Sequence, residues 1–466
     1  DKDFGQIVRE KVLLYKPAYM GNGVDILGEK EVCEKWDIAH VGQVIDILGL
    51  QGDTSDNIPG IPGFGPKTAS QLLKLYGSVE GIIENVSALK GKQKELVQQY
   101  SEQALLSKKL AANAAPEDFE SGRATVGTGP YKFVRFARGD RVEYTRNDNY
   151  WGGRPAWDKV TLRIMPTDPV RTAALLAGEL DVIEHVPPAD RERLAKNPKL
   201  RLDQTTSWRT LFLHLDQYRA APLNVVDGTG KPLAKNPFMD VRVRRAMSMA
   251  INRNALTERV MEKLAVPASN IVSPGVFGHN AQLKTEPFDP DGAKKLLAEA
   301  GYPNGFGITL SGPNNRYIND EQILQAVAQM FTRVGIQTKV EALPLAVYFP
   351  KARKEETSVS LLGWGSFAGD LALRSLLATP SAERGWGSWN WGKFSNAKVD
   401  ELLTQAFATT DPKAREAVVR DAMAVAMANV PVIPLHHQIV SWAMRADIAY
   451  TPRTDEFTFG HLFKPK

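Results

Sequence analysis

The stretch "FGITLSGPNNRYINDEQILQAVAQMFTRVGIQTKVEAL", residues 306–343, contains the alternation that decides the fold class. The runs "FGITLSG" and "QTKVEAL" at its two ends have the composition of strands, and "DEQILQAVAQMFTRVG" between them repeats apolar residues at helical spacing. Asp320 stands where a helix N-cap is expected, and Gly335 stands where a C-cap is expected. A strand followed by a helix and a second strand predicts a layered α/β or α+β domain.

The same alternation continues over most of the chain beyond residue 127. Asp240, Asp289 and Asp411 stand at the starts of three further helical patterns, where N-caps are expected. We find no internal repeat. The further patterns are the strand-like runs "RVEYTRN", "KVTLRIM", "TLFLHLD" and "VSLLGW" and the helical runs "DVRVRRAMSMAINRNALTERVME", "DPDGAKKLLAEAG" and "DPKAREAVVRDAMAVAMANV".

The composition is that of a soluble globular protein, with 43% hydrophobic and 24% charged residues. The net charge of +5, from 58 basic and 53 acidic residues, is weak evidence for a polyanionic partner. Cys33 is the only cysteine, which excludes a disulfide within the chain and is compatible with both cytosol and periplasm. No apolar run reaches the roughly 20 residues of a membrane-spanning helix, so no transmembrane segment is predicted. The chain begins with "DKDFG", without Met or a signal sequence, and we expect a processed N-terminus or a fragment.

A domain boundary is predicted in "AANAAPEDFESGRATVG", residues 111–127, which is Ala-rich and polar and has no apolar period. The chain before this boundary has a different character. "GDTSDNIPGIPGFGPKTASQLLKLYGSVEGI", residues 52–82, turns through repeated Gly and Pro and continues into a helix that is predicted to begin at Pro66 and end at Gly77.

The turn before this helix has two interpretations. Gly60, Gly63 and Gly65 allow a tight turn with free backbone N–H groups, which can accept a phosphate at the helix N-terminus, and Lys67 adds a positive charge beside it. The same residues are also compatible with a plain helix–turn–helix connection.

"DKD" at 1–3, "GDTSDNIPG" at 52–60, "IPGFGPKTA" at 61–69 and "LLSKKLA" at 105–111 together carry a resemblance. Residues 1–111 resemble the C-terminal part of the 5′-3′ exonuclease domain of bacterial DNA polymerase I. The resemblance implies a helix–hairpin–helix that binds DNA through residues 60–94, with Gly60, Gly63, Gly65 and Lys67 at the contact. It also implies that Asp1, Asp3, Asp53 and Asp56 are carboxylate ligands of Mg²⁺ in a two-metal nuclease site. Because the family's other acidic ligands precede the DKD motif, we expect no nuclease activity.

A second resemblance covers the rest of the chain. From about residue 113 onward the sequence resembles the solute-binding proteins of peptide ABC transporters, the dipeptide and oligopeptide class. The resemblance implies two α/β lobes that close over a peptide, the transporter's membrane subunits as partners, a periplasmic location and no required cofactor. It rests on "GTGPYKFVRF" (127–136), "RNDNYWGGRPAWDKVTLRI" (146–164), "LLAGELDVI" (175–183), "PFMDVRVRRAMSMAINRNAL" (237–256), "DPDGAKKLLAEAGYP" (289–303), "WNWGKFSNAKVDELL" (389–403) and "VPVIPLHH" (430–437).

The second resemblance also suggests ligand-binding residues. Asp370 in "LLGWGSFAGDLALRSLL" resembles the family's acceptor for the ligand α-amino group, although it is equally compatible with capping the following helix. Arg316 in "GPNNRYIND" is a candidate for the ligand carboxylate. Four tryptophans are candidates for the cleft lining or, alternatively, for the core: Trp364, Trp386, Trp389 and Trp391.

Taken together, the resemblances predict a type II, two-lobed periplasmic-binding-protein-like α/β fragment preceded by a small, mainly α helix–hairpin–helix nuclease fragment. We interpret the chain as an artefactual fusion near residues 110–114, because the first segment implies the cytoplasm and the second the periplasm. The favoured function is peptide binding, and the alternative is a DNA-binding nuclease fragment. A third interpretation is that neither activity is retained, because both segments lack their N-terminal parts. The predicted domains are 1–111 (nuclease-like), 112–126 (junction), 127–235 (lobe one, incomplete), 236–445 (lobe two) and 446–466 (return to lobe one).

Overall fold

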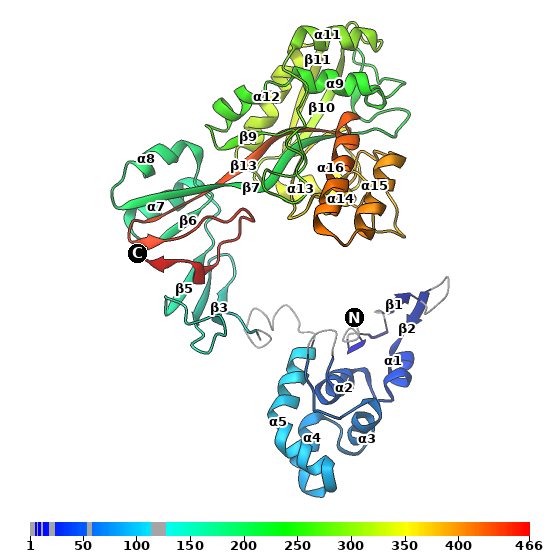
Figure 1. Ribbon diagram of the computed structural model, residues 1–466, viewed down its shortest axis with the longest axis vertical. Coiled ribbons are helices and arrows are strands. Elements are labelled where there is room, and N and C mark those ends of the chain that lie inside the picture. The colour runs from blue at the N-terminus through cyan, green and yellow to red at the C-terminus, as the bar shows by residue number, and fades with distance from the viewer. Residues whose placement is uncertain (1–4, 7, 11–12, 18–23, 54–57, 113–126) are drawn as a thin grey trace. The chain divides into compact units, whose positions relative to one another are not determined.

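The computed structural model describes residues 5–6, 8–10, 13–17, 24–53, 58–112 and 127–466. The chain forms two compact units, Asp1–Ile164 and Met165–Lys466 (Figure 1). The boundary between them falls within the segment 127–235 that was assigned to lobe one from the sequence.

The first unit begins with a mainly helical part, as the sequence predicts for the residues before 112. Its helices pack around a core that includes Ile47, Leu72 and Val97, all of which are almost completely buried. Its elements are the antiparallel strands β1 (Leu14–Pro17) and β2 (Val24–Leu27) and the helices α1 (Glu29–Trp36), α2 (Val44–Gln51), α3 (Pro66–Tyr76), α4 (Val79–Glu84) and α5 (Gly91–Ala111).

The connection between α2 and α3 requires glycine at position 60. Gly60 has a φ of 59°, and a β-carbon there would lie 2.2 Å from the backbone nitrogen of Gly52. Its N–H donates to the Ser107 hydroxyl of α5 at 3.1 Å, which fixes the turn against the longest helix of the unit. The predicted helix is confirmed, since α3 begins at Pro66 and is followed by Gly77 with a φ of 79°.

A half-buried lysine joins three helices of this unit. The Lys108 ammonium of α5 lies 2.6 Å from a carboxylate oxygen of Asp46 in α2 and 2.6 Å from one of Glu80 in α4. Asp46 also accepts the backbone N–H of Val79, the first residue of α4, at 2.9 Å. Removing one partner from such a network leaves a poorly solvated charge, so the network contributes to a single arrangement of these helices.

A three-stranded antiparallel sheet completes the first unit, in the order β3-β4-β5. Its side chains are half-buried or exposed. Ion pairs such as that of Arg141 with Glu143 lie on it. The strands are β3 (Tyr131–Ala137), β4 (Arg141–Arg146) and β5 (Lys159–Arg163).

The second unit is built on an eight-stranded mixed sheet whose main path is β11-β10-β12-β7-β13-β6. Strand β10 is parallel to β11 and β12, while β12, β7, β13 and β6 pair antiparallel. In Figure 1 the long strands β7 and β13 run from the helices α7 and α8 to the region of β10 and α9. The strands are β6 (Val182–Glu184), β7 (Leu200–Leu215), β8 (Val225–Val226), β9 (Ala265–Pro267), β10 (Phe306–Pro313), β11 (Ile336–Leu343), β12 (Val359–Gly365) and β13 (Val432–Arg445), and the short pair β14 (Ile448–Ala449) and β15 (Lys464–Pro465) follows.

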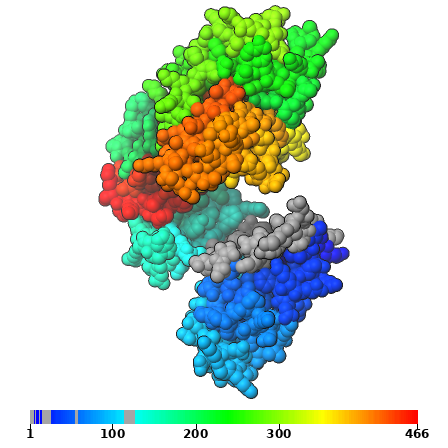
Figure 2. All heavy atoms as spheres, turned by 45° about the vertical axis from the view of Figure 1, so that its right-hand side comes forward, coloured from blue at the N-terminus to red at the C-terminus, as the bar shows by residue number. Residues whose placement is uncertain are grey.

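Both faces of this sheet are covered by helices. Successive side chains of its strands point to opposite faces, and apolar side chains on both faces need a covering layer. In β7, Leu211 and Leu213 enter one hydrophobic core and Phe212 enters the other, and in β12 Leu361 and Leu362 divide in the same way. Figure 2 shows α14 to α16, in orange, as a continuous surface of the unit. The helices are α7 (Asp168–Ala177), α8 (Arg191–Ala195), α9 (Val241–Ala250), α10 (Arg253–Ala255), α11 (Pro290–Glu299), α12 (Asp320–Arg333), α13 (Leu345–Arg353), α14 (Gly369–Leu376), α15 (Ala397–Ala408) and α16 (Pro412–Ala428).

Most of the predicted helix starts are confirmed. The side chains of Asp240, Asp289 and Asp411 each accept a backbone N–H in the first turn of the helix that follows. The prediction for Asp320 is wrong, because the N-cap of α12 is Asn319, with a φ of 54°. Asp320 is instead the first residue of the helix, and its carboxylate accepts N–H groups from the preceding loop, beginning with that of Arg316.

Candidate ligand-binding site

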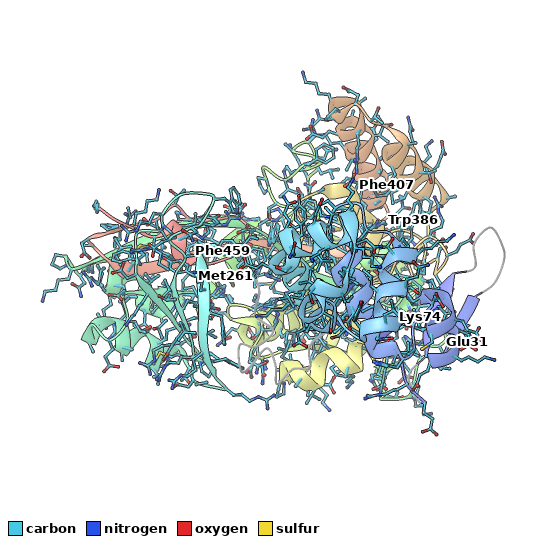
Figure 3. All side chains as sticks on the ribbon, turned by 90° about the horizontal axis from the view of Figure 1, so that it is seen from below. Glu31, Lys74, Met261, Trp386, Phe407 and Phe459 are labelled. Carbon is cyan, nitrogen blue, oxygen red and sulfur yellow. The ribbon has the colours of Figure 1, made fainter. Side chains whose placement is uncertain are left out.

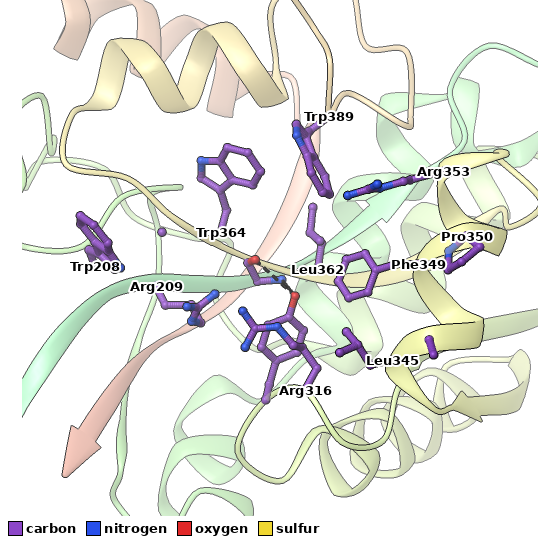
Figure 4. Close-up of a pocket in the computed structure, with 14 residues that line it drawn as sticks. Trp208, Arg209, Arg316, Leu345, Phe349, Pro350, Arg353, Leu362, Trp364 and Trp389 are labelled. Carbon is purple, nitrogen blue, oxygen red and sulfur yellow. Dashed lines mark hydrogen bonds between the residues drawn. The ribbon is translucent and has the colours of Figure 1, made fainter. Parts of the chain in front are cut away.

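A cavity of about 740 Å³ lies in the second unit and is lined by 14 residues (Figure 4). Arg316 follows β10, Leu345 follows β11, and Trp364 lies near the end of β12. The carboxyl ends of these three parallel strands therefore meet at the cavity, where open α/β sheets bind their ligands. The lining residues are Trp208, Arg209, Arg316, Tyr317, Leu345, Ala346, Phe349, Pro350, Arg353, Leu362, Gly363, Trp364, Gly365 and Trp389.

Aromatic rings form much of the wall. The rings of Trp364 and Trp389 lie 5.2 Å apart, and Phe349 meets Trp389 edge-on at 6.5 Å. Two of the four tryptophans predicted from the sequence therefore line the cavity, as candidates for contact with an apolar ligand group.

The other two predicted tryptophans lie outside the lining. Trp391 is 9% exposed and packs behind Trp389 and against His214, at 5.5 Å from each ring. Trp386, labelled in Figure 3, lies in the connection between α14 and α15, where the Arg384 guanidinium covers its ring at 3.4 Å. A role for Trp391 in ligand contact stays a prediction.

The floor of the cavity depends on two glycines of β12. A β-carbon at Gly363 would lie 2.6 Å from the ring of Tyr317, and one at Gly365 would lie 2.6 Å from the indole nitrogen of Trp208. The Tyr317 hydroxyl accepts the N–H of Gly363 at 2.9 Å and donates to its carbonyl at 3.3 Å (Figure 4). Burial raises the pKa of Tyr317, which keeps the hydroxyl protonated for this donation.

Hydrogen bonds hold the backbone of Arg316, whereas its guanidinium has no anionic partner among the described residues. Its N–H donates to Asp320 at 2.8 Å, and that of Tyr317 donates to the same oxygen at 3.0 Å. The guanidinium lies over the Tyr317 ring at 5.2 Å and makes no ion pair with any described residue. Arg316 was predicted from the sequence, and the structure places it in the cavity with its charge available.

The other two arginines of the lining differ from each other. Arg209 donates through Nε to both carboxylate oxygens of Glu456, at 3.1 and 3.2 Å, which neutralises it. The pKa of Glu456 is lowered overall. Burial acts to raise it, but the hydrogen bond and charge of Arg209 and the hydrogen bond from Ser207 together outweigh burial. Arg353, at the end of α13, is exposed, lies over the Trp389 ring at 5.0 Å and makes no ion pair within the parts of the chain that the structure describes.

Asp370 lies outside the cavity lining. It is in the first turn of α14 with no exposed surface, and Nε of Arg415 in α16 donates to its carboxylate at 2.8 Å. Its second oxygen accepts the N–H of Leu371 at 2.8 Å. The carboxylate thus has a cationic partner within the protein, and its role as acceptor for a ligand amino group stays a prediction.

The nuclease-like residues are only partly described. Asp1, Asp3 and Asp56 lie outside the described residues, and Asp53 is 2% exposed and exchanges backbone hydrogen bonds with Ile58 at 2.9 and 2.8 Å. Within the described ranges, no group of three His, Cys, Asp or Glu side chains is placed to hold a metal ion. Lys67 is an exposed residue of α3, near Gly63 and Gly65, and DNA contact by these residues stays a prediction.

Sequence reasoning missed Trp208, Phe349 and Arg353. Arg353 belongs to "KARKEE", a charged run that is typical of a solvated helix end, so its proximity to Trp389 leaves no local pattern. Trp208 reaches the cavity only because β7 pairs with β12, and that pairing joins segments about 150 residues apart. Arg316, Leu345 and Trp364 stand just beyond or near the end of a strand, and this position is the signal that could have grouped them.

The family described as bacterial extracellular solute-binding proteins, family 5 Middle, matches residues 69–377. The chain belongs to this family. The heme-binding protein A of Haemophilus influenzae is 28% identical over 334 residues, covering 70% of this chain and 56% of that protein. The dipeptide-binding protein of Escherichia coli is 26% identical, with 69% and 58% covered, and the glutathione-binding protein GsiB of Pectobacterium atrosepticum is 33% identical, with 67% and 59% covered. The chain spans less than three fifths of the length of these relatives.

Solved structures show the same fold. The periplasmic binding protein DppA of Helicobacter pylori, in complex with the peptide STSA, is similar with a TM-score of 0.62 at 24% identity, covering 81% of this chain and 67% of that one. HbpA2 of Haemophilus parasuis is similar with a TM-score of 0.61 at 24% identity, covering 79% and 68%. The predicted two-lobed, periplasmic-binding-protein-like α/β fold is therefore confirmed.

The other resemblance receives no support from these comparisons. The family match begins at residue 69, inside the segment 1–111 that was assigned to a nuclease from the sequence. A nuclease segment, a DNA partner and a fusion origin stay predictions. Members of the matched family are typically periplasmic or extracellular. Among the described residues, no helix is long and apolar enough to span a membrane.

Proposed function

We propose that this chain is the solute-binding component of an ABC transporter and that it takes a carboxylate-bearing solute, a peptide or a ligand of the kind its relatives are named for, in the cavity at the carboxyl ends of β10, β11 and β12. Its partners are then the solute and the membrane subunits of the transporter. The observation that carries the proposal is Arg316, which lies in a cavity with tryptophan walls and makes no ion pair within the described part of the chain.

The size and lining of the cavity support a small organic ligand. Ligand sites usually measure about 300–1,000 Å³ and combine apolar walls with a few placed polar groups. Here about 740 Å³ is enclosed by Trp, Phe, Leu and Pro side chains, with arginine as the polar element. Such a lining favours a ligand that has an apolar body and at least one anionic group.

The position of Arg316 supports recognition of a carboxylate. Guanidinium groups bind carboxylates through two parallel hydrogen bonds, and such charge-assisted bonds are stronger than neutral ones. Asp320 fixes the backbone of residues 316 and 317, so the side chain begins from an ordered position. Dipeptides, glutathione and heme, for which the three relatives are named, all carry carboxylates, which agrees with this chemistry.

Titration of the full chain with a mixed library of di- to pentapeptides, glutathione and heme, followed by calorimetry, tests the proposal. We expect at least one of these solutes to bind, and we expect Arg316→Gln to weaken that binding about tenfold or more, because one charged hydrogen-bonded pair is lost. Arg333→Gln, at the exposed end of α12 and outside the cavity lining, is the matched control and should leave affinity unchanged. Absence of binding across the panel, or binding indifferent to Arg316, contradicts the proposal.

A further inference from the structure

We infer that the cavity selects solutes with two acidic groups on an apolar body and discriminates against zwitterionic peptides. The inference rests on the proposed function and specifies its substrate class. It follows from Arg316 and Arg353, two cations in one cavity that make no ion pair with any described residue, together with the absence of any acidic side chain among the 14 lining residues.

Of the three arginines in the lining, Arg209 alone has a carboxylate partner among the described residues, Glu456. Arg316 and Arg353 face aromatic rings, those of Tyr317 and Trp389, which attract a cation but carry no charge. These two guanidinium groups give the cavity a positive potential, and a ligand that places one anionic group at each of them offsets it.

The two cations come from different elements of the fold. Arg316 comes from the loop between β10 and α12, whereas Arg353 ends α13. In the view of Figure 4 they stand apart, with the side chains of Leu362 and Phe349 drawn between them. Each guanidinium can take a carboxylate of its own, so the arrangement favours two acidic groups on a body that packs on the apolar residues.

The charges around the cavity also bear on a ligand ammonium group. The two carboxylates in hydrogen-bond contact with lining residues are already occupied, Glu456 by Arg209 and Asp320 by backbone N–H groups. Asp370 is paired with Arg415 outside the lining. An ammonium group in the cavity would find two guanidinium groups and no acidic partner, which penalises a free peptide N-terminus.

Two kinds of solute share the required chemistry. One is a peptide whose amino group is blocked and which carries two carboxylates, and the other is a porphyrin with two propionates. We infer the shared feature, two acids on an apolar body, and the experiment separates the two sources.

Calorimetry and tryptophan fluorescence on the full chain measure the selectivity, since Trp208, Trp364 and Trp389 line the cavity. The peptide probes are Phe-Leu, N-acetyl-Phe-Gln and N-acetyl-Phe-Glu, and the porphyrin probes are protoporphyrin IX and its dimethyl ester. We expect N-acetyl-Phe-Glu to bind about tenfold or more tightly than N-acetyl-Phe-Gln, which lacks only the second charge, or protoporphyrin to exceed its ester by a similar factor. We expect Phe-Leu to bind more weakly than either acetylated peptide.

Arg353→Gln should abolish the preference for the second acidic group, whereas Lys354→Gln, an exposed neighbour outside the lining, should retain it. A peptide preference that is lost in Arg353→Gln identifies the source as acidic peptides, and a porphyrin preference lost in the same way identifies it as porphyrins. The inference is overturned if Phe-Leu binds as tightly as N-acetyl-Phe-Glu and if Arg353→Gln changes the affinity ratio of neither the acetylated peptides nor the two porphyrins. That result leaves the proposed function intact. If neither these probes nor the solutes of the first panel bind, the proposed function fails as well.

Discussion

At the scale of the residue, the charged side chains near the cavity differ in whether a described residue of the protein already pairs with them. Arg316, Trp364 and Trp389 were predicted as ligand-binding residues, and the structure places all three in one cavity. Asp370 was predicted on the same grounds but has Arg415 as its partner, because α14 packs on α16 and brings the two side chains together. The motif around Asp370 shows that a carboxylate is present. It does not show its partner, because Arg415 lies 45 residues further along the chain.

We expect the substitution Asp370→Ala to lower the stability of the second unit. Asp370→Ala leaves Arg415 beside a buried site without its anion, and breaking a buried pair costs about 3–5 kcal/mol. Because the Arg415 side chain keeps 35% of its exposure, we expect a smaller loss of unfolding free energy, about 2 kcal/mol. Urea denaturation measures it, with Asp421→Ala on the exposed side of α16 as the control. A variant of undiminished stability that loses solute affinity would instead establish Asp370 as a ligand residue.

At the scale of the element, hydrophobic period and capping residues predicted most helices and strands of the second unit. The exception at Asp320 is informative, since its carboxylate organises the loop before the helix rather than the helix start. The pattern at 240–262 is also interrupted, because α9 ends at Ala250 and the chain continues as α10 and a π-helical turn, Leu256–Val260. Local periodicity predicts that apolar residues face a core, but not where the helix must break to follow that core.

At the scale of the element, we expect a side chain added to strand β12 at Gly363 to disturb the cavity. The close approach of Tyr317 to Gly363 leaves no room for a side chain, so Gly363→Ala must displace that ring or the strand. We expect lower solute affinity and a loss of about 1–3 kcal/mol in unfolding free energy, the usual cost of overpacking. Calorimetry and urea denaturation measure the two effects. Gly385→Ala is the control for a glycine with open space around it, although its φ of 61° adds some strain. Unchanged affinity in Gly363→Ala would show that the Tyr317–Gly363 contact does not shape the site.

At the scale of the whole molecule, the sequence predicted the layered α/β class but not the order of the strands. The central pair of the second unit, β7 with β13, joins residues more than 200 positions apart, and no local pattern specifies such a pairing. The same pairing explains why the site was predicted only in part. Residues next to one another in sequence, such as those around Trp364, can be read together, whereas Trp208 and Arg353 reach the cavity through the tertiary arrangement.

The β7–β13 pair also buries three histidines, which makes the stability of the second unit depend on pH. His214, His436 and His437 are at most 2% exposed. Burial lowers the pKa of each from 6.5 to about 3. The two rings at positions 214 and 436 have no hydrogen-bond partner among the described residues that would stabilise a charge. The folded unit therefore holds all three in the neutral form.

The sign of the effect follows from these pKa values. Below pH 6.5 the unfolded chain binds protons at these rings while the folded unit does not until about pH 3, so stability is present above 6.5 and is lost as pH falls. Each ring contributes about 1.4 kcal/mol per pH unit, so we expect a loss of about 4 kcal/mol between pH ~7.5 and ~5.5. Urea denaturation followed by tryptophan fluorescence measures it, because most tryptophans lie in the second unit. His436→Gln should remove about a third of the slope, whereas the exposed His40→Gln should keep it. A flat profile over this range would mean that the buried rings can accept protons without unfolding the unit.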